Sequence, residues 1–214
     1  MTRHHAGRVS VVTPVRDADP KALTACVESV RAQDYYNWEL CLCDDGSADP
    51  GTLAVLKRYR GVDTRIKVHL PGPALGYAGA SNAAAEFATG EFLAFLAPDD
   101  TLAPSALGAV ARAAAAHDDA DLLYTDEDRL GAGGSACDAR RKPDWSPASL
   151  SSATDPGRLL VVRKVLFLEL GGFRAGCAGA EDHDLTQRAA GRARRVAHLP
   201  QVLYHRQGGG VVRV

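Results

Sequence analysis

The chain has 214 residues, of which 46% are hydrophobic and 24% charged, and its formal net charge is −1. This is the balance of an ordinary globular protein, and it provides no global basic field that would collect nucleic acid or an anionic membrane. No stretch comes near the roughly 18 consecutive apolar residues of a membrane-spanning helix. We therefore expect no integral membrane segment, which leaves peripheral association open.

The first hundred residues alternate between short apolar runs and amphipathic segments. A run rich in β-branched residues at 9–13 predicts the first strand, and Pro14 is expected to end it. Asp19 and Pro20 fit the N-cap and first turn of a helix over 20–33. Further strands are predicted at 38–43, 66–70 and 92–96, and further helices at 50–59 and 78–89. This alternation favours an α/β fold with a mainly parallel sheet and helices on both faces.

The second half is less regular, and no linker divides the chain into independent domains. Helices are predicted at 104–117, 164–170 and 182–190, strands at 122–124, 159–162 and 202–205, and a polar loop at 131–144. Residues 1–7 and 207–214 are expected to be flexible ends.

The five cysteines are odd in number and lack paired CxxC spacing, which predicts a reduced, cytoplasmic setting. Cys41 and Cys43 alternate with leucines in a predicted strand, and we interpret them as small core residues.

Several common nucleotide and hydrolase motifs are missing from the sequence. The first strand is followed by Thr13-Pro14-Val15-Arg16-Asp17, which is not the GxGxxG of dinucleotide-binding proteins. GxxxxGK[ST], GxSxG and HExxH are absent as well. If this sheet binds a phosphorylated ligand, we expect a metal to hold the phosphates.

Paired aspartates follow two of the predicted strands. In parallel α/β sheets, ligands bind outside the carboxyl ends of the strands, where Asp44-Asp45 and Asp99-Asp100 stand. Carboxylates together with substrate phosphates are typical ligands of Mg²⁺ and Mn²⁺. Either pair could instead form a turn or cap the next helix. At this stage both interpretations remain open.

A third acidic cluster spans residues 181–184, and His205 follows a short apolar strand. Carboxylates at the start of a helix are favoured by its dipole, and one of them could also serve as a general base. A lone histidine is more often structural than a metal ligand, so both alternatives are kept.

Taken in order, these motifs resemble the family-2 glycosyltransferases over residues 8–206, and they are similar to the rhamnosyltransferase or O-antigen-type branch. The segments that carry the resemblance are Ser10–Val15, Cys26–Val30, Trp38–Ser47, Ser81–Ala84, Thr89–Phe92, Pro98–Asp100, Tyr124–Asp128, Lys142–Pro147, Gly171–Arg174, Glu181–Asp182 and Val202–His205.

The resemblance implies a single-domain GT-A fold with a Rossmann-like sheet, in which 8–100 is the nucleotide-binding half and 101–206 the acceptor and catalytic half. It implies an inverting enzyme of polysaccharide or glycoconjugate biosynthesis that moves a sugar from a UDP-, dTDP- or GDP-linked donor to an acceptor hydroxyl. The acceptor would be a glycan, a lipid-linked sugar or a small molecule.

The resemblance also assigns roles to individual residues. Asp182 is implied as the general base with Glu181 beside it, and Trp145 and Arg188 as residues of the acceptor side. The residues implied to bind Mn²⁺ or Mg²⁺ are Asp99, Asp100 and His205. Those implied to bind the nucleotide sugar are Thr13, Pro14, Val15, Asp44, Asp45, Gly76, Asn82 and Asp99.

One departure from the family pattern keeps other functions open. Ala97 stands where the family usually has a third carboxylate. The chain could therefore be a sugar-nucleotide-binding relative with impaired catalysis. A sugar-phosphate nucleotidyltransferase would share an acidic metal site, but it would need a glycine-rich, basic loop after the first strand, and residues 13–17 are a poor match.

Overall fold

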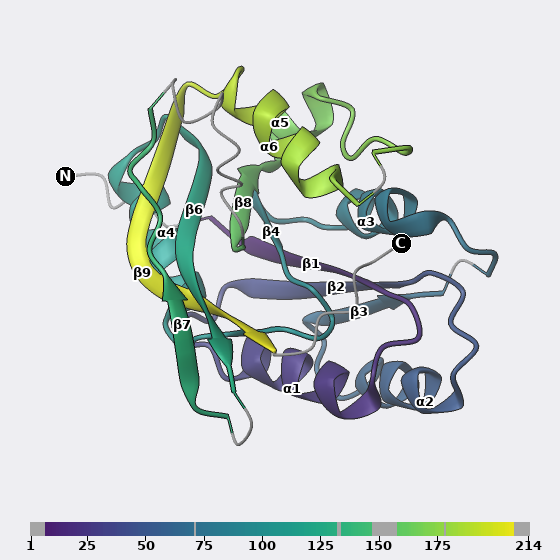
Figure 1. Cartoon of the computed structure of the whole chain (residues 1–214). Coiled ribbons are helices and arrows are strands. Elements are labelled where there is room, and N and C mark those ends of the chain that lie inside the picture. The colour runs from purple at the N-terminus through teal and green to yellow at the C-terminus, as the bar shows by residue number, and fades with distance from the viewer. Residues whose placement is uncertain (1–6, 71, 132–133, 147–157, 178, 208–214) are drawn as a thin grey trace.

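The computed structural model describes residues 7–70, 72–131, 134–146, 158–177 and 179–207 (Figure 1). The elements of the first half are β1 (Val9–Val15), α1 (Pro20–Arg31), β2 (Trp38–Asp44), α2 (Pro50–Tyr59), β3 (Ile66–His69), α3 (Gly76–Glu86) and β4 (Phe92–Phe95). Those of the second half are β5 (Thr101–Leu102), α4 (Ala106–Ala116), β6 (Ala120–Leu130), β7 (Ala136–Arg140), β8 (Leu160–Arg163), α5 (Lys164–Glu169), α6 (Glu181–Ala190) and β9 (Arg195–Gln207).

The described strands form one sheet in the order β3-β2-β1-β4-β8-β6-β9-β5, and β7 pairs with β6. Strands β3, β2, β1 and β4 are all parallel to one another, as the sequence predicts for the first half. Strand β8 then enters antiparallel to both β4 and β6, while β6 and β9 are parallel. The predicted α/β single-domain fold is confirmed, with a sheet that becomes mixed in its second half.

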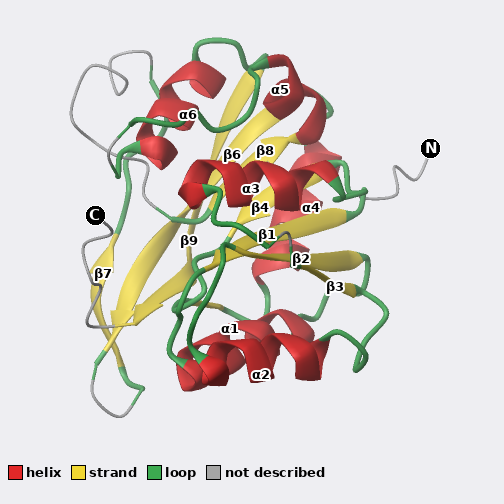
Figure 2. Ribbon diagram, turned by 90° about the vertical axis from the view of Figure 1, so that its right-hand side faces the viewer, coloured by secondary structure: helices red, strands yellow, loops and turns green. Residues whose placement is uncertain are grey.

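Helices cover both faces of this sheet. Figure 2 shows α1 and α2 on one side of the strands and α3, α5 and α6 on the other. Side chains alternate between the two faces along a strand, so Leu40 and Leu42 pack in the core with α1, α2 and α4. Cys41 and Cys43 point into the second core, under α3, α5 and α6, and are fully buried, which confirms their interpretation as core residues. None of the described helices is long and apolar enough to cross a bilayer.

Pro14 does not end the first strand, contrary to expectation. It pairs with Cys43 inside β1, which runs on to Val15. Val12 accepts a hydrogen bond from Leu96 N–H on the β4 side, and Pro14, two residues on, faces the same side. Because the β4 ladder ends at Val12, no hydrogen bond is lost at the proline nitrogen.

The second half contains longer strands than the sequence predicts. The segments expected at 122–124 and 202–205 are parts of β6 and β9, and the expected polar loop contains β7. Charged residues at the end of β6 hide its strand character from a hydrophobicity pattern. In β9, Pro200 is accommodated because the pairing with β6 shifts register between Leu199 and Val202.

At the chain ends, residues 1–6 and 208–214 lie outside the described residues. Gly7, which the sequence assigns to the flexible end, accepts a hydrogen bond from the Tyr35 hydroxyl at 3.1 Å. Gln207 is the last residue of β9. The structure thus describes one residue beyond each predicted boundary.

A buried carboxylate ties the amino-terminal ends of the parallel strands together. Glu39 on β2 accepts hydrogen bonds from Ser10 Oγ on β1 at 2.6 Å and from Gly90 N–H before β4 at 3.2 Å. Its other partners include the Thr89 backbone N–H and Lys67 Nζ on β3, the latter at 2.7 Å. Burial alone would raise the pKa of Glu39, but these donors outweigh it and lower the pKa to about 2.

We expect Glu39→Gln to lower the free energy of unfolding at pH 7 by about 1–3 kcal/mol, because Lys67 loses its buried charge partner. The folded pKa of about 2 lies below the ordinary value of 4.5. The stabilisation is therefore complete above about pH 4.5 and is lost as the pH falls towards 2. Urea unfolding at pH 7 and pH 3 measures both effects. Glu86→Gln, at an exposed position, is the control, and a deficit of equal size at both pH values would contradict the prediction.

Candidate functional site

The first acidic pair shapes the turn at the end of β2. Asp44 accepts a hydrogen bond from Ser47 N–H at 3.2 Å, which closes a turn around Gly46, whose φ is +75°. Asp45 Oδ1 accepts hydrogen bonds from the backbone N–H groups of Leu75 and Gly76, the latter at 2.9 Å. Asp45 thereby caps the start of α3 from a neighbouring strand, where the helix dipole favours a carboxylate. Both aspartates are buried.

The three predicted donor residues of β1 lie directly beside this turn. Thr13, Pro14 and Val15 pair in register with the last residues of β2, and Asp45 N–H donates to Val15 O at 2.7 Å. Thr13 is fully buried, and within the described part of the chain its hydroxyl oxygen has no hydrogen-bond partner. These residues therefore lie on the strand next to the turn at 44–47.

The second acidic pair follows β4 and is joined to β9 by a tyrosine. Tyr204 on β9 donates its hydroxyl to Asp100 Oδ2 at 2.6 Å and accepts a hydrogen bond from Ala97 N–H at 3.2 Å. Gln207 N–H donates to Asp100 Oδ1 at 3.0 Å. Burial raises the pKa of Asp100, and the neighbouring charge of Asp99 adds to that shift. Hydrogen bonds from Tyr204 and Gln207 therefore join Asp100 to the end of β9.

His205, the predicted third metal ligand, lies between β5 and β6. It is in register with Thr101 on one side and with Asp128 on the other. Its Nδ1 is 2.6 Å from Asp128 Oδ1, and a hydrogen bond from Nδ1–H to that carboxylate would leave Nε2 as the ring's acceptor nitrogen. Carboxylate and imidazole donors suit Mn²⁺ chemically. However, the described residues contain no group of three or more His, Cys, Asp or Glu side chains already arranged as a metal site.

The candidate base, Asp182, stands in the first turn of α6 and faces the start of α3. The Tyr77 hydroxyl donates to Asp182 Oδ1 at 2.7 Å, and Arg158 Nη1 lies 3.2 Å from Asp182 Oδ2. Tyr77 directly follows Gly76, whose N–H binds Asp45. Figures 1 and 2 both show α6 beside α3. Asp45 and Asp182 are thus connected through the first turn of one helix, and Glu181 begins the helix that carries Asp182.

Two residues with predicted ligand roles, Asn82 and Arg188, form hydrogen bonds to the turn at 172–173. Asn82 on α3 forms two hydrogen bonds with the Phe173 backbone, both at 2.9 Å. Arg188 on α6 donates to Gly172 O and to Asp184 Oδ2 on its own helix, at 2.8 Å each. At Gly172 (φ +70°) a Cβ would lie 2.4 Å from Asn82 Oδ1, so a side chain there would strain the backbone and displace Asn82 from its present position. The described contacts of Asn82 and Arg188 are structural.

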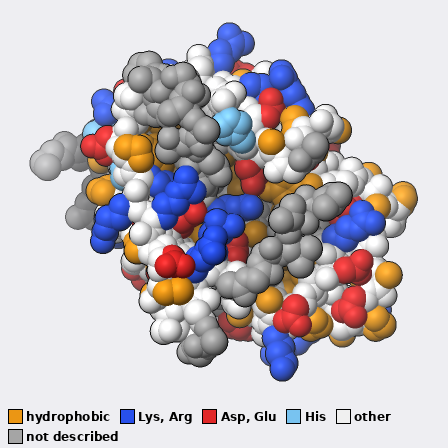
Figure 3. Space-filling view, in the orientation of Figure 1, with side chains coloured by type: hydrophobic (Ala, Val, Ile, Leu, Met, Phe, Trp, Pro, Cys, Tyr) orange, Lys and Arg blue, Asp and Glu red, His pale blue; other side chains and the backbone are white. Residues whose placement is uncertain are grey.

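Strand β6, which pairs with the strand of His205, carries three buried acids, Asp126, Glu127 and Asp128. Their partners are basic groups from the second half of the chain, among them Lys142, which is 3.2 Å from Glu127, and His198, which is 2.9 Å from Asp126. Figure 3 shows Lys and Arg side chains gathered over β6, β7 and β9. Trp145, the other predicted acceptor-side residue, is half-buried in the segment that follows Lys142.

The sequence analysis did not single out Tyr77, Arg158 or Asp128. Asp128 lies in the motif 124–128 and could have been paired with His205 once both were placed on neighbouring strands. Tyr77 and Arg158 carry no periodic or motif signal, and only the packing of α3 against α6 brings them to Asp182.

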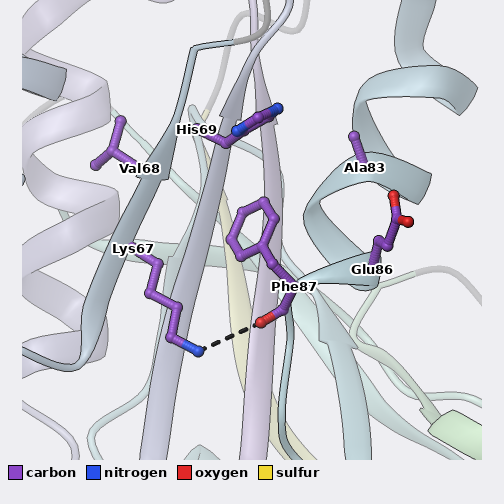
Figure 4. Close-up of a pocket in the computed structure, with 6 residues that line it drawn as sticks. All are labelled: Lys67, Val68, His69, Ala83, Glu86 and Phe87. Carbon is purple, nitrogen blue, oxygen red and sulfur yellow. Dashed lines mark hydrogen bonds between the residues drawn. The ribbon is translucent and has the colours of Figure 1, made fainter.

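A cavity of about 450 Å³ opens elsewhere, between the edge strand β3 and α3 (Figure 4). Its lining residues are Lys67, Val68, His69, Ala83, Glu86 and Phe87. No predicted site residue is among them, so this cavity is distinct from the acidic strand ends.

Comparison with known proteins gives a consistent identification. The family model described as glycosyl transferase family 2 matches residues 10–128, which is more than half of the chain. The O-antigen biosynthesis protein RfbC of Myxococcus xanthus is 39% identical over 201 residues, which cover 94% of this chain and 16% of RfbC. The chain spans about a fifth of the length of such curated relatives.

Two solved structures share the fold. Staphylococcus aureus TarS 1–349 in complex with UDP-GlcNAc superposes with a TM-score of 0.79 at 22% identity, over 95% of this chain and 59% of TarS. The mannosyltransferase PcManGT of Pyrobaculum calidifontis, in complex with GDP-Man and Mn²⁺, has a TM-score of 0.70 at 20% identity, over 95% of this chain and 57% of its own. The expected GT-A fold is therefore confirmed, and the chain belongs to glycosyl transferase family 2.

Proposed function

We propose that the chain catalyses inverting, metal-assisted transfer of a sugar from a nucleoside diphosphate to an acceptor hydroxyl, with Asp182 as the general base. The observation that carries this proposal is the placement of Asp182. Its hydrogen bond to Tyr77 holds it next to the start of α3, which Asp45 caps from the end of β2. A carboxylate thus faces the edge of the sheet where α/β proteins bind nucleotides.

The chemistry follows from these positions. The acceptor oxygen attacks the anomeric carbon, and its proton goes to the Asp182 carboxylate. The bond from that carbon to the diphosphate oxygen breaks, and its electron pair stays on the diphosphate. A base on the face of the sugar opposite the leaving group gives inversion. The residues that would hold Mn²⁺ or Mg²⁺ are Asp99, Asp100 and His205, and the ion would offset the charge of the departing diphosphate.

The proposed substrates rest on chemistry and on the relatives. TarS was solved with UDP-GlcNAc and PcManGT with GDP-Man and Mn²⁺, and RfbC is an O-antigen biosynthesis protein. We therefore propose a UDP-, dTDP- or GDP-linked donor and a glycan, lipid-linked or small-molecule acceptor, used in the cytoplasm. Ala97, which stands where the family usually has a third carboxylate, favours a non-catalytic sugar-nucleotide-binding protein as the second candidate.

Asp182→Asn is expected to lower turnover by about 10²–10⁴-fold, because the amide cannot accept the acceptor's proton. It should not weaken binding of the nucleoside diphosphate. Release of nucleoside diphosphate from a panel of UDP-, dTDP- and GDP-sugars with Mn²⁺ measures turnover, and calorimetry measures binding. Asp119→Asn, at a half-exposed residue paired with Arg195, is the matched control. Unchanged turnover in Asp182→Asn refutes the base assignment, and binding without turnover in the wild type supports the second candidate.

His205→Ala is expected to reduce by about 10-fold or more the gain in nucleoside diphosphate affinity that Mn²⁺ provides, because an imidazole ligand is lost. Calorimetric titrations with Mn²⁺ and with EDTA measure this gain directly. His69→Ala, which changes a histidine of the separate cavity, should retain it. If His205→Ala responds to Mn²⁺ as the wild type does, His205 is not a ligand.

A further inference from the structure

Arg158 forms an ion pair with the candidate base Asp182. Its Nη1 is 3.2 Å from Asp182 Oδ2. Burial by itself would lower the pKa of the guanidinium, but nearby Tyr204, Asp182 and Asp100 raise it, and the charge of Arg158 in turn lowers the pKa of Asp100. One cation therefore links the electrostatics of the candidate base on α6 to those of the aspartate pair after β4.

The backbone of Arg158 is fixed from two sides by buried charged groups. Arg158 N–H donates to Glu127 Oε2 at 2.6 Å, and Lys142 Nζ donates to Arg158 O. Lys142 and Glu127 also pair with each other at 3.2 Å, with side chains that are 1% and 3% exposed. The Arg158 side chain itself is 26% exposed. The chain therefore holds the main chain of this residue rigidly and leaves part of its guanidinium accessible.

The charge of the site calls for such a cation. Asp99, Asp100 and Asp182 are all acidic, and a nucleoside diphosphate would add further negative charge close to them. The described residues offer no ready group of three metal-binding side chains, and Ala97 takes the place of a further carboxylate. A guanidinium is always charged and presents a planar set of donors that matches phosphate oxygens. Its ion pair with Asp182 is made through Nη1.

We propose that Arg158 is a donor-binding residue that exchanges partners, pairing with Asp182 when no donor is bound and with the donor's diphosphate during transfer. This inference rests on the proposed function. In the transfer step, Arg158 donates hydrogen bonds to the diphosphate as the bond from the anomeric carbon to its oxygen breaks and the electron pair moves to that oxygen. Asp182, released from the ion pair, takes the proton of the acceptor hydroxyl as the new carbon–oxygen bond forms. Arg158 would thus pair first with the Asp182 carboxylate and then with the diphosphate.

A purely structural Arg158 would behave differently. If it only held α6 in position, its loss would disturb the whole site and weaken nucleoside and nucleoside diphosphate alike. A diphosphate-binding Arg158 contributes only where phosphates are present. Comparing each nucleoside diphosphate with its own nucleoside therefore separates the two roles.

The experiment measures calorimetric affinities of UDP, dTDP and GDP, and of the corresponding nucleosides, for the wild type and its variants at fixed Mn²⁺. For the diphosphate that the wild type binds, Arg158→Gln should weaken affinity about 10-fold or more and leave the nucleoside unchanged, with Arg158→Lys intermediate. Arg174→Gln removes the same charge from an exposed arginine 3.8 Å from Asp184 and should change neither affinity. Asp182→Asn keeps Arg158 and frees it from its partner, so it should strengthen diphosphate binding several-fold even if Arg158→Gln fails to fold.

Each other outcome has a distinct meaning. Equal weakening of nucleoside and diphosphate in Arg158→Gln, or unchanged diphosphate affinity, overturns the role of Arg158 and leaves the proposed transfer intact. Weaker diphosphate binding by Asp182→Asn overturns the exchange of partners. A wild type that binds none of the three diphosphates overturns the proposed function, and this inference with it.

Discussion

The position of Asp182 depends on hydrogen bonds from two side chains to the backbone of the turn at 171–173. Asn82 binds both polar atoms of the Phe173 backbone, and Arg188 binds the carbonyl of Gly172. One of these side chains belongs to α3 and the other to α6, so the turn fastens the two helices to each other. The bonds satisfy backbone groups that would otherwise be costly to leave unpaired. Glycine suits position 172 because φ is +70° and a Cβ there would displace the Asn82 side chain that binds Phe173.

Helix α3 connects the turn at 171–173 to the end of β2 in the sheet. Asp45 at the end of β2 binds the first amides of α3, and Tyr77 in the next position reaches Asp182. A carboxylate that caps a helix from another element fixes the helix along its axis as well as stabilising its dipole. The turn at 171–173 and the cap at Asp45 therefore act on the same rigid helix. Residues more than a hundred positions apart meet because both are fastened to α3.

The sequence predicted the parts of this arrangement that depend on local pattern. Strand–helix alternation placed every element of the first half, and the acidic pairs could be placed at strand ends because parallel strands share one edge. It could not predict which oxygens of Asp45 and Asp100 bind backbone amides, since that depends on Leu75 and Gln207 approaching from distant segments. The strand at β6 was underestimated because the partners of its acids come from residues 140–206, which local hydrophobicity does not register.

The same contacts explain how acidic residues can be both structural and chemically useful. Asp45 and Asp100 are each held in place by hydrogen bonds from backbone N–H groups. If Asp100 binds a cation, as proposed, its carboxylate would lose little conformational freedom, because these hydrogen bonds already fix it. Bringing these acidic side chains together on folding is unfavourable, because their negative charges repel one another. Arg158, anchored through its backbone to Glu127 and Lys142, offsets part of that charge from within the chain. Under the proposed function, carboxylates together with one arginine would suit a ligand that is anionic and arrives with a cation, such as a metal-bound diphosphate.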